Sequence, residues 1–93
     1  MNNLKHLIGA YFYQLWDQFE YPTWEEAVDD FVRRSPDRAA ATPAEIDELL
    51  TSAPDNVIED KLVGFGFDHS PPEGVRSWLA EVRDRIATQL PGD

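Results

Sequence analysis

The sequence contains no cysteine and only two histidines, which removes several kinds of functional site from consideration. Without cysteine there can be no disulfide framework, no thiolate metal site and no cysteine nucleophile. His6 and His69 are far apart in sequence, and neither has the second histidine at helical spacing that is typical of a zinc site. The lack of cysteine fits a reducing compartment. We therefore expect a cytoplasmic protein.

Long apolar runs are also absent. No run approaches the ~18 residues that are needed to span a bilayer. The N-terminal stretch carries one lysine and one histidine, then aromatic residues, without the small-residue cleavage site of a signal peptide. No segment shows the period-2 alternation of a strand, and there is no internal repeat. The sequence thus predicts neither a membrane-spanning nor a β-sheet protein.

Basic residues are scarce. Eighteen Asp and Glu stand against eight Lys and Arg, which gives a net charge of −10. A negative field of this size repels phosphate backbones and anionic lipid, so we expect no nucleic-acid or membrane partner. The same field attracts a basic protein and speeds its association. The alternative is that the acidity serves solubility alone.

What the sequence does contain is enough apolar material for one small helical core. With 93 residues and 42% hydrophobic content, residues 1–93 are expected to form a single all-α domain of five to six short helices, monomeric when free. The first helix is predicted from Leu4 to about Trp16. Gly9 inside it either permits the close approach of a neighbouring helix or is simply a tolerated glycine. The apolar residues of this helix recur at i, i+3, i+4 spacing: Leu4, Leu7, Ile8, Tyr11, Phe12, Leu15 and Trp16.

Capping signals and prolines delimit the later helices. Thr23 and Glu26 form a capping box, which predicts a helix from there to about Arg34. Ser35-Pro36 predicts the next start, and the helical pattern runs to Ala53. Within that segment, Thr42-Pro43-Ala44-Glu45 repeats the capping pattern. This favours two helices, with one kinked helix as the alternative.

Two further helices complete the prediction. One covers about 55–63, with Val57, Ile58 and Leu62 on its apolar side, and Phe65 and Phe67 are expected to close the end of the core. The last covers about 73–90. Its outer face mixes arginines and acids and is expected to be a solvated surface with i, i+4 pairs. The apolar stripe of this last helix consists of Val75, Trp78, Leu79, Val82, Ile86 and Leu90.

Catalytic chemistry has no positive support in the sequence. Adjacent carboxylates such as Asp29 and Asp30 lie about 100° apart on a helix, so they do not converge as an acid–base dyad. The acids of residues 55–60 lack the alternating ligands and the central glycine of a calcium loop. We therefore predict no enzyme, no catalytic residue, no metal and no cofactor. A small metal-dependent enzyme is the remote alternative.

The charge is arranged in two blocks that contain six acids and no base each. The first acidic block covers residues 17–30 and the second covers residues 45–60. Aromatic residues flank the first block, and rigid aromatics beside carboxylates are typical of a protein interface. We predict the first block as the partner-binding surface, with the second as the competing one; alternatively the aromatics belong to the core and the acids face solvent. The predicted contact residues are Tyr13, Asp17, Phe19, Glu20, Glu25, Glu26, Asp29 and Asp30.

Four motifs in order resemble a known family. The stretch Leu7–Asp17, LIGAYFYQLWD, is similar to the "aYFhQdw" opening of the immunity proteins of contact-dependent growth inhibition (CdiI type). PTWEEAV at residues 22–28 and AEIDELL at residues 44–50 resemble the family's next two segments. The family's closing pattern is matched by three segments of this chain: FGF at residues 65–67, Pro71-Pro72, and GVRSWL at residues 74–79. Tyr13 and Leu15 replace the His and Asp usual in the opening motif.

The resemblance implies a helical protein that binds and neutralises a cognate toxin domain, commonly a nuclease, in the cytoplasm of the producing cell. It implies stoichiometric occlusion rather than catalysis. The acidic blocks agree with this, since a nuclease has a basic cleft for its substrate. If the two replaced positions recognise the toxin, this chain recognises a different one. The alternative of another class is an acidic helical adaptor or regulatory module unrelated to toxins.

Overall fold

A computed structural model describes residues 2–12, 23–67, 71 and 73–90. Every regular element within these ranges is an α-helix, which confirms the all-α prediction. The helices are α1 (Asn2–Tyr11), α3 (Trp24–Arg34), α4 (Pro36–Ser52), α5 (Asp55–Gly64) and α6 (Val75–Gln89).

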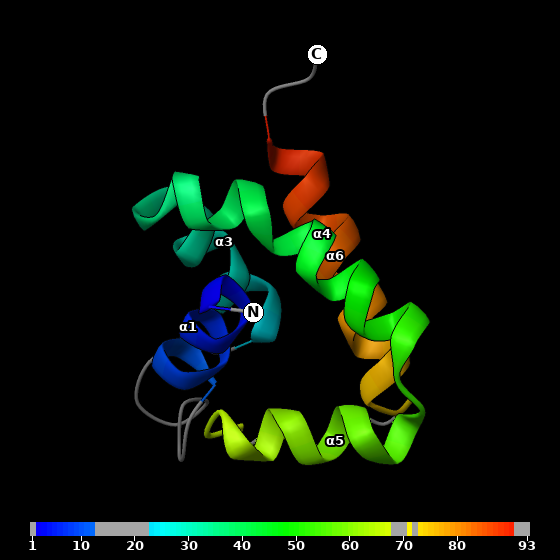
Figure 1. Cartoon of the computed structure of the whole chain (residues 1–93). Helices are drawn as coiled ribbons and strands as arrows, with labels where there is room; N and C mark the ends of the chain where they lie inside the picture. The colour runs from blue at the N-terminus through cyan, green and yellow to red at the C-terminus, as the bar shows by residue number, and fades with distance from the viewer. Residues whose placement is uncertain (1, 13–22, 68–70, 72, 91–93) are drawn as a thin grey trace.

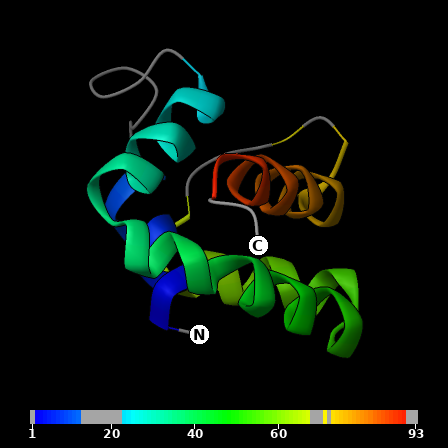
Figure 2. The same cartoon turned by 90° about the horizontal axis from the view of Figure 1, so that it is seen from above.

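The longest two helices form the centre of the bundle. α4 packs along α6 in the most extensive contact between elements, and α3 packs against both of them (Figure 1). α1 lies against α3 and α4 on the other side. α5 crosses the far end of the molecule and contacts α6 (Figures 1 and 2). All five helices therefore have α4 or α6 as a neighbour.

The core is built from the stripes that the periodicity predicts. The apolar residues of α1 that fall in the described part are buried, whereas Leu15 and Trp16 lie outside it. Phe65 and Phe67 pack against the core as expected. Val57 is 36% exposed, so its predicted inward position is wrong: Ile58 and Leu62 occupy the buried stripe of α5. The other fully or nearly fully buried apolar residues are Ala27, Val28, Phe31, Ala39, Ile46, Leu49, Trp78, Leu79, Val82 and Ile86.

Trp78 is the centre of an aromatic cluster that joins four parts of the chain. Its ring lies 5.1 Å from that of Phe12 and 6.0 Å from that of Trp24, both at steep edge-to-face angles. The Phe67 ring lies 5.0 Å away on a third side. Edge-to-face pairs at these distances each add about 0.5–1.5 kcal/mol beyond burial. This cluster fixes the start of α3 against α6.

The start of α3 follows the predicted capping pattern. The Thr23 side-chain oxygen accepts a hydrogen bond of 3.3 Å from the backbone N–H of Glu26, and Thr23 itself is extended. The helix ends at Arg34, as predicted. Ser35 then serves both helices, because its backbone N–H donates to the Phe31 carbonyl at 2.8 Å while its own carbonyl accepts from Ala39 at 2.9 Å. Its hydroxyl makes no capping bond.

The favoured division of residues 36–53 into two helices is wrong. α4 is continuous with Pro43 inside it, and Figure 1 shows the ribbon changing direction partway along. The Thr42 hydroxyl donates 2.7 Å back to the Arg38 carbonyl instead of capping a new helix. Ala39, Thr42, Ile46 and Leu49 are all buried, so packing on both sides of the proline holds the helix together.

Of the two alternatives for Gly9, the structure favours the close approach of a neighbouring helix. A Cβ atom built at Gly9 would stand 3.0 Å from the backbone oxygen of Phe65, just beyond the end of α5. A side chain there would force the α5 end away from α1. The glycine thus permits the close contact between α1 and the backbone just beyond α5.

Candidate functional site

The predicted contact residues divide into two groups. Tyr13, Asp17, Phe19 and Glu20 lie outside the described residues. Glu25, Glu26, Asp29 and Asp30 all lie on α3, which places them on one helix but in different surroundings. Whether a partner touches any of them stays a prediction.

Asp29 is held by the last helix. Its two carboxylate oxygens each accept a 2.8 Å hydrogen bond from the Arg85 guanidinium, and Gln89 Nε2 donates to Oδ1 at 2.7 Å. The bond from Arg85 is the main cause that lowers the pKa of Asp29 below its usual value, against the opposing effect of burial. This carboxylate is therefore already engaged in joining α3 to α6.

Asp30 is the one buried acid among the described residues. It is only 4% exposed and accepts from Arg33 and from Arg34 Nε, the latter at 3.2 Å, while both arginines remain largely exposed. The pKa of the neighbouring Tyr11 is raised, mainly by burial and to a smaller extent by the Asp30 charge. Asp30 is therefore covered and engaged with two arginines of its own helix.

Glu25 and Glu26 remain available. Glu26 is exposed and Glu25 half-buried, and neither carboxylate forms an ion pair within the described part of the chain. Both lie in the first turn of α3, where the helix dipole favours negative charge. The hydrogen bond to Asp29 is the main cause that raises the pKa of Arg85, and the Glu25 charge raises it further. The exposed end of α3 is thus a small acidic surface supported by a fixed ion pair.

The acids of the second block likewise include some that pair with an arginine of α6 and some that make no ion pair with a described residue. Arg76 of α6 donates 2.6 Å to Asp55, and also 2.6 Å and 2.7 Å to the carbonyls of Leu50 and Ala53. These carbonyls lie at the C-terminal end of α4, where the last carbonyls of a helix have no N–H donor within the helix. Arg76 therefore joins the end of α4 to the start of α5.

Two more acids of this block are engaged within the protein. Arg83 of α6 donates 2.7 Å to Asp47 of α4. Glu45 accepts 3.0 Å from the backbone N–H of Leu4 and 2.6 Å from the Asn3 amide, so it caps the N-terminal end of α1 rather than completing the pattern at Thr42. Glu48, Glu59 and Asp60 are exposed and make no ion pair with a described residue.

The outer face of α6 is exposed at Glu81 and Asp84, as expected, but the predicted i, i+4 pairs are wrong for its arginines. Arg76, Arg83 and Arg85 each pair with a carboxylate on a different helix, namely α5, α4 and α3. Their spacing along α6 points them to separate neighbours. Sequence reasoning missed this because the partners are 21 to 56 residues away.

The rest of the described chain offers little else of chemical interest. No group of three His, Cys, Asp or Glu side chains there is placed to hold a metal ion. Nor is any helix in those ranges long and apolar enough to cross a membrane. His6 is half-buried, since its ring packs 6.1 Å from Phe31 and 6.4 Å from Tyr11.

The comparisons with known proteins identify the family. A family model described as "CdiI immunity protein" matches residues 1–86. Neither the curated proteins nor the solved structures gave a match. The match covers most of the 93 residues, including all four resembling motifs and the helices that carry the two acidic blocks. The chain therefore belongs to the CdiI immunity protein family, and this membership implies a toxin-neutralising immunity function.

Proposed function

We propose that this chain acts as one domain and neutralises a basic cognate toxin domain, of the nuclease class, by stoichiometric occlusion through the acidic surface of α3. It acts by binding and not by catalysis, without metal or cofactor, as a free monomer in the cytoplasm. It contacts neither nucleic acid nor membrane. The observation that carries the proposal is the family match together with the Glu25 and Glu26 carboxylates of α3, which make no ion pair with a described residue.

The charge of the chain supports this choice of partner. A protein of net charge −10 repels a nucleic acid but attracts the basic cleft that a nuclease uses to hold one. Long-range attraction of this kind raises the association rate and is weakened by salt. Occlusion follows because a bound acidic helix takes the place of the phosphate backbone.

Glu25 and Glu26 are the residues best placed for this role among those predicted. Their carboxylates do not have to leave an internal partner before they pair with a toxin lysine or arginine. Asp29 keeps Arg85 in place behind them through its bidentate bond. Tyr13, Asp17, Phe19 and Glu20 are proposed to extend the same surface.

The first experiment tests the immunity function itself. The chain is co-expressed with the toxin C-terminal domain encoded next to it, and growth is measured. Growth is expected to be restored only when the immunity protein is present. Persistent toxicity at full expression of a folded chain would contradict the proposal and favour an adaptor unrelated to toxins.

The second experiment locates the surface with matched variants. The double variant Glu25→Lys, Glu26→Lys should weaken toxin binding about ten-fold or more, and should reduce its salt dependence. The matched control is Glu59→Lys, Asp60→Lys on α5, which makes the same charge change at two exposed acids without internal partners. Weakening by the control and not by the α3 variant would move the interface to the second acidic block.

A further inference from the structure

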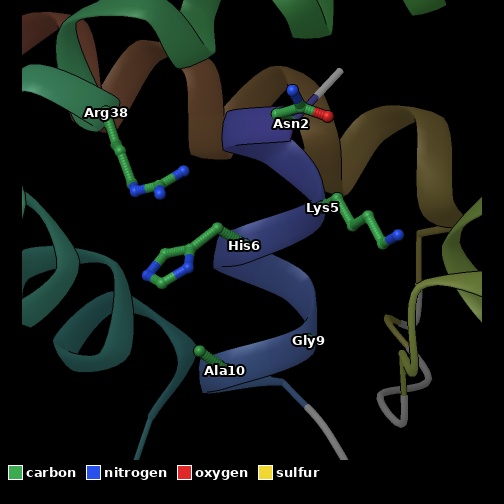
Figure 3. Close-up of a pocket in the computed structure, with 6 residues that line it drawn as sticks. All are labelled: Asn2, Lys5, His6, Gly9, Ala10 and Arg38. Carbon is green, nitrogen blue, oxygen red and sulfur yellow. The ribbon is translucent and has the colours of Figure 1, made fainter.

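A shallow open hollow of about 340 Å³ lies over the exposed side of α1 and faces the start of α4. It is lined by Asn2, Lys5, His6, Gly9, Ala10 and Arg38. Figure 3 shows Arg38 reaching from α4 toward α1, His6 on the same flank of α1, and Lys5 extending from the opposite flank. Two cations therefore bracket one exposed helix face.

These two cations differ from most others in the protein. The structure describes all eight Lys and Arg residues, and five of them pair with carboxylates: Arg33, Arg34, Arg76, Arg83 and Arg85. Lys5, Arg38 and Lys61 make no ion pair with a described residue. In a chain with eighteen acids, two cations that line one hollow and make no ion pair with a described residue are available to an acidic group of another molecule.

The shape of the hollow fits a side chain of another protein. Gly9 and Ala10 carry little or no side chain, so a partner can come close to the α1 backbone one turn beyond Lys5 and His6 (Figure 3). The His6 ring forms a firm wall because it packs against Phe31 and Tyr11. The hollow is open to solvent and does not enclose a small molecule as ligand pockets do. The net charge of −10 disfavours a nucleic acid at the same place.

We propose that the Lys5–Arg38 hollow receives an aspartate or glutamate side chain of the toxin domain. It is a second contact, of opposite charge to the acidic surface of α3, and it rests on the proposed immunity function. Two contacts of opposite sign fix the orientation of the bound toxin, since a toxin turned around would bring like charges together. Arg38 supplies a planar donor for the carboxylate, and Lys5 supplies a point charge.

The test compares charge reversals at cations without internal partners. Toxin affinity is measured by calorimetry for the wild type, for Lys5→Glu and Arg38→Glu singly and together, and for Lys61→Glu on α5, which is the control matched to each single variant. The double variant is expected to bind the toxin about ten-fold or more weakly, and the control within about two-fold of wild type. Circular dichroism checks folding. If the double variant does not fold, Lys5→Gln with Arg38→Gln gives the same comparison without charge reversal.

The outcomes separate this inference from the proposed function. Equal affinity of the wild type and the double variant would overturn the hollow as a contact and leave the immunity function intact. No binding by the wild type would overturn both. Titration with inorganic phosphate is the third arm: phosphate binding that the double variant loses, with unchanged toxin affinity, would assign the hollow to a small anion and also overturn the inference.

Discussion

The acidic face of α3 and the acidic face of α4 and α5 differ in how α6 holds them. On α3 a single arginine, Arg85, takes Asp29 and leaves the first turn free. On α4 and α5, Arg76 and Arg83 take one acid from each helix, and Glu45 is drawn to the N-terminal end of α1. The free acids of α3 are adjacent, whereas those of the second block are divided between α4 and α5.

This difference teaches that a run of acids contains two kinds of carboxylate. One kind faces an arginine of a neighbouring helix and stabilises the bundle. The other faces solvent and is available to a partner. Since an engaged carboxylate must give up its internal partner before it binds another protein, only the second kind contributes freely to association. Variants that separate stability from binding therefore test the comparison directly.

The largest effect is expected within α3 itself. Asp30→Lys places a positive charge in a buried position beside Arg33 and Arg34, and should lower the free energy of unfolding by about 3 kcal/mol. Glu26→Lys, four residues earlier on the exposed surface, should change it by less than about 1 kcal/mol, mostly through the helix dipole. Urea unfolding measures both. Equal losses would show that burial does not distinguish the two acids.

The second prediction concerns the arginines that hold the second block. Arg76→Ala removes three hydrogen bonds, two of them to the C-terminal carbonyls of α4, and should cost about 2 kcal/mol of stability. Arg83→Ala removes one interhelical ion pair and should cost about 0.5 kcal/mol. Thermal unfolding of the two variants gives the comparison. A larger loss for Arg83→Ala would contradict the role of Arg76 as the link between α4 and α5.

The third prediction concerns the pH dependence of the ion pair between α3 and α6. The pKa of Asp29 is lowered in the folded protein, so the folded state favours the ionised form. Its contribution is present above the unfolded pKa of about 3.9 and is lost as pH falls through the lower folded value. Asp29→Asn should therefore cost about 1 kcal/mol at neutral pH, and the difference from wild type should shrink below about pH 4.

A double-mutant cycle with Arg85→Gln provides the control for Asp29. Both single variants remove the same bidentate pair, so the double variant should lose little more stability than either alone. Urea unfolding at neutral and acid pH measures the cycle. Additive losses, or a difference that stays constant at low pH, would show that Asp29 acts in another way.

Much of the fold could be predicted because its causes are local. The i, i+3, i+4 stripes of α1 and α6 repeat often enough to identify the buried side, and Thr23 carries its capping signal within four residues. The prediction that a new helix begins near Pro43 was wrong for the same reason. Its local signal favours a helix start, but the buried residues on both sides of it, Ala39 and Ile46, are held by neighbours that no local pattern reveals.

The candidate site could be predicted only in part. The sequence places Glu25, Glu26, Asp29 and Asp30 on one helix, and adjacent acids look equivalent there. Burial of Asp30 and the bond from Arg85 to Asp29 depend on how α3 packs against its neighbours. The hollow at Lys5 and Arg38 was missed because these residues lie 33 positions apart and have no shared motif.

Sequence by itself determined that this protein is an acidic, cysteine-free bundle of helices with the motifs of its family, because composition and helical periodicity act within a few residues. Tertiary structure alone decided which charges are available. The pairs of Arg76, Arg83 and Arg85 with acids on other helices form because those side chains come within about 4 Å of one another. That distance is set by the packing of α3, α4 and α5 around α6.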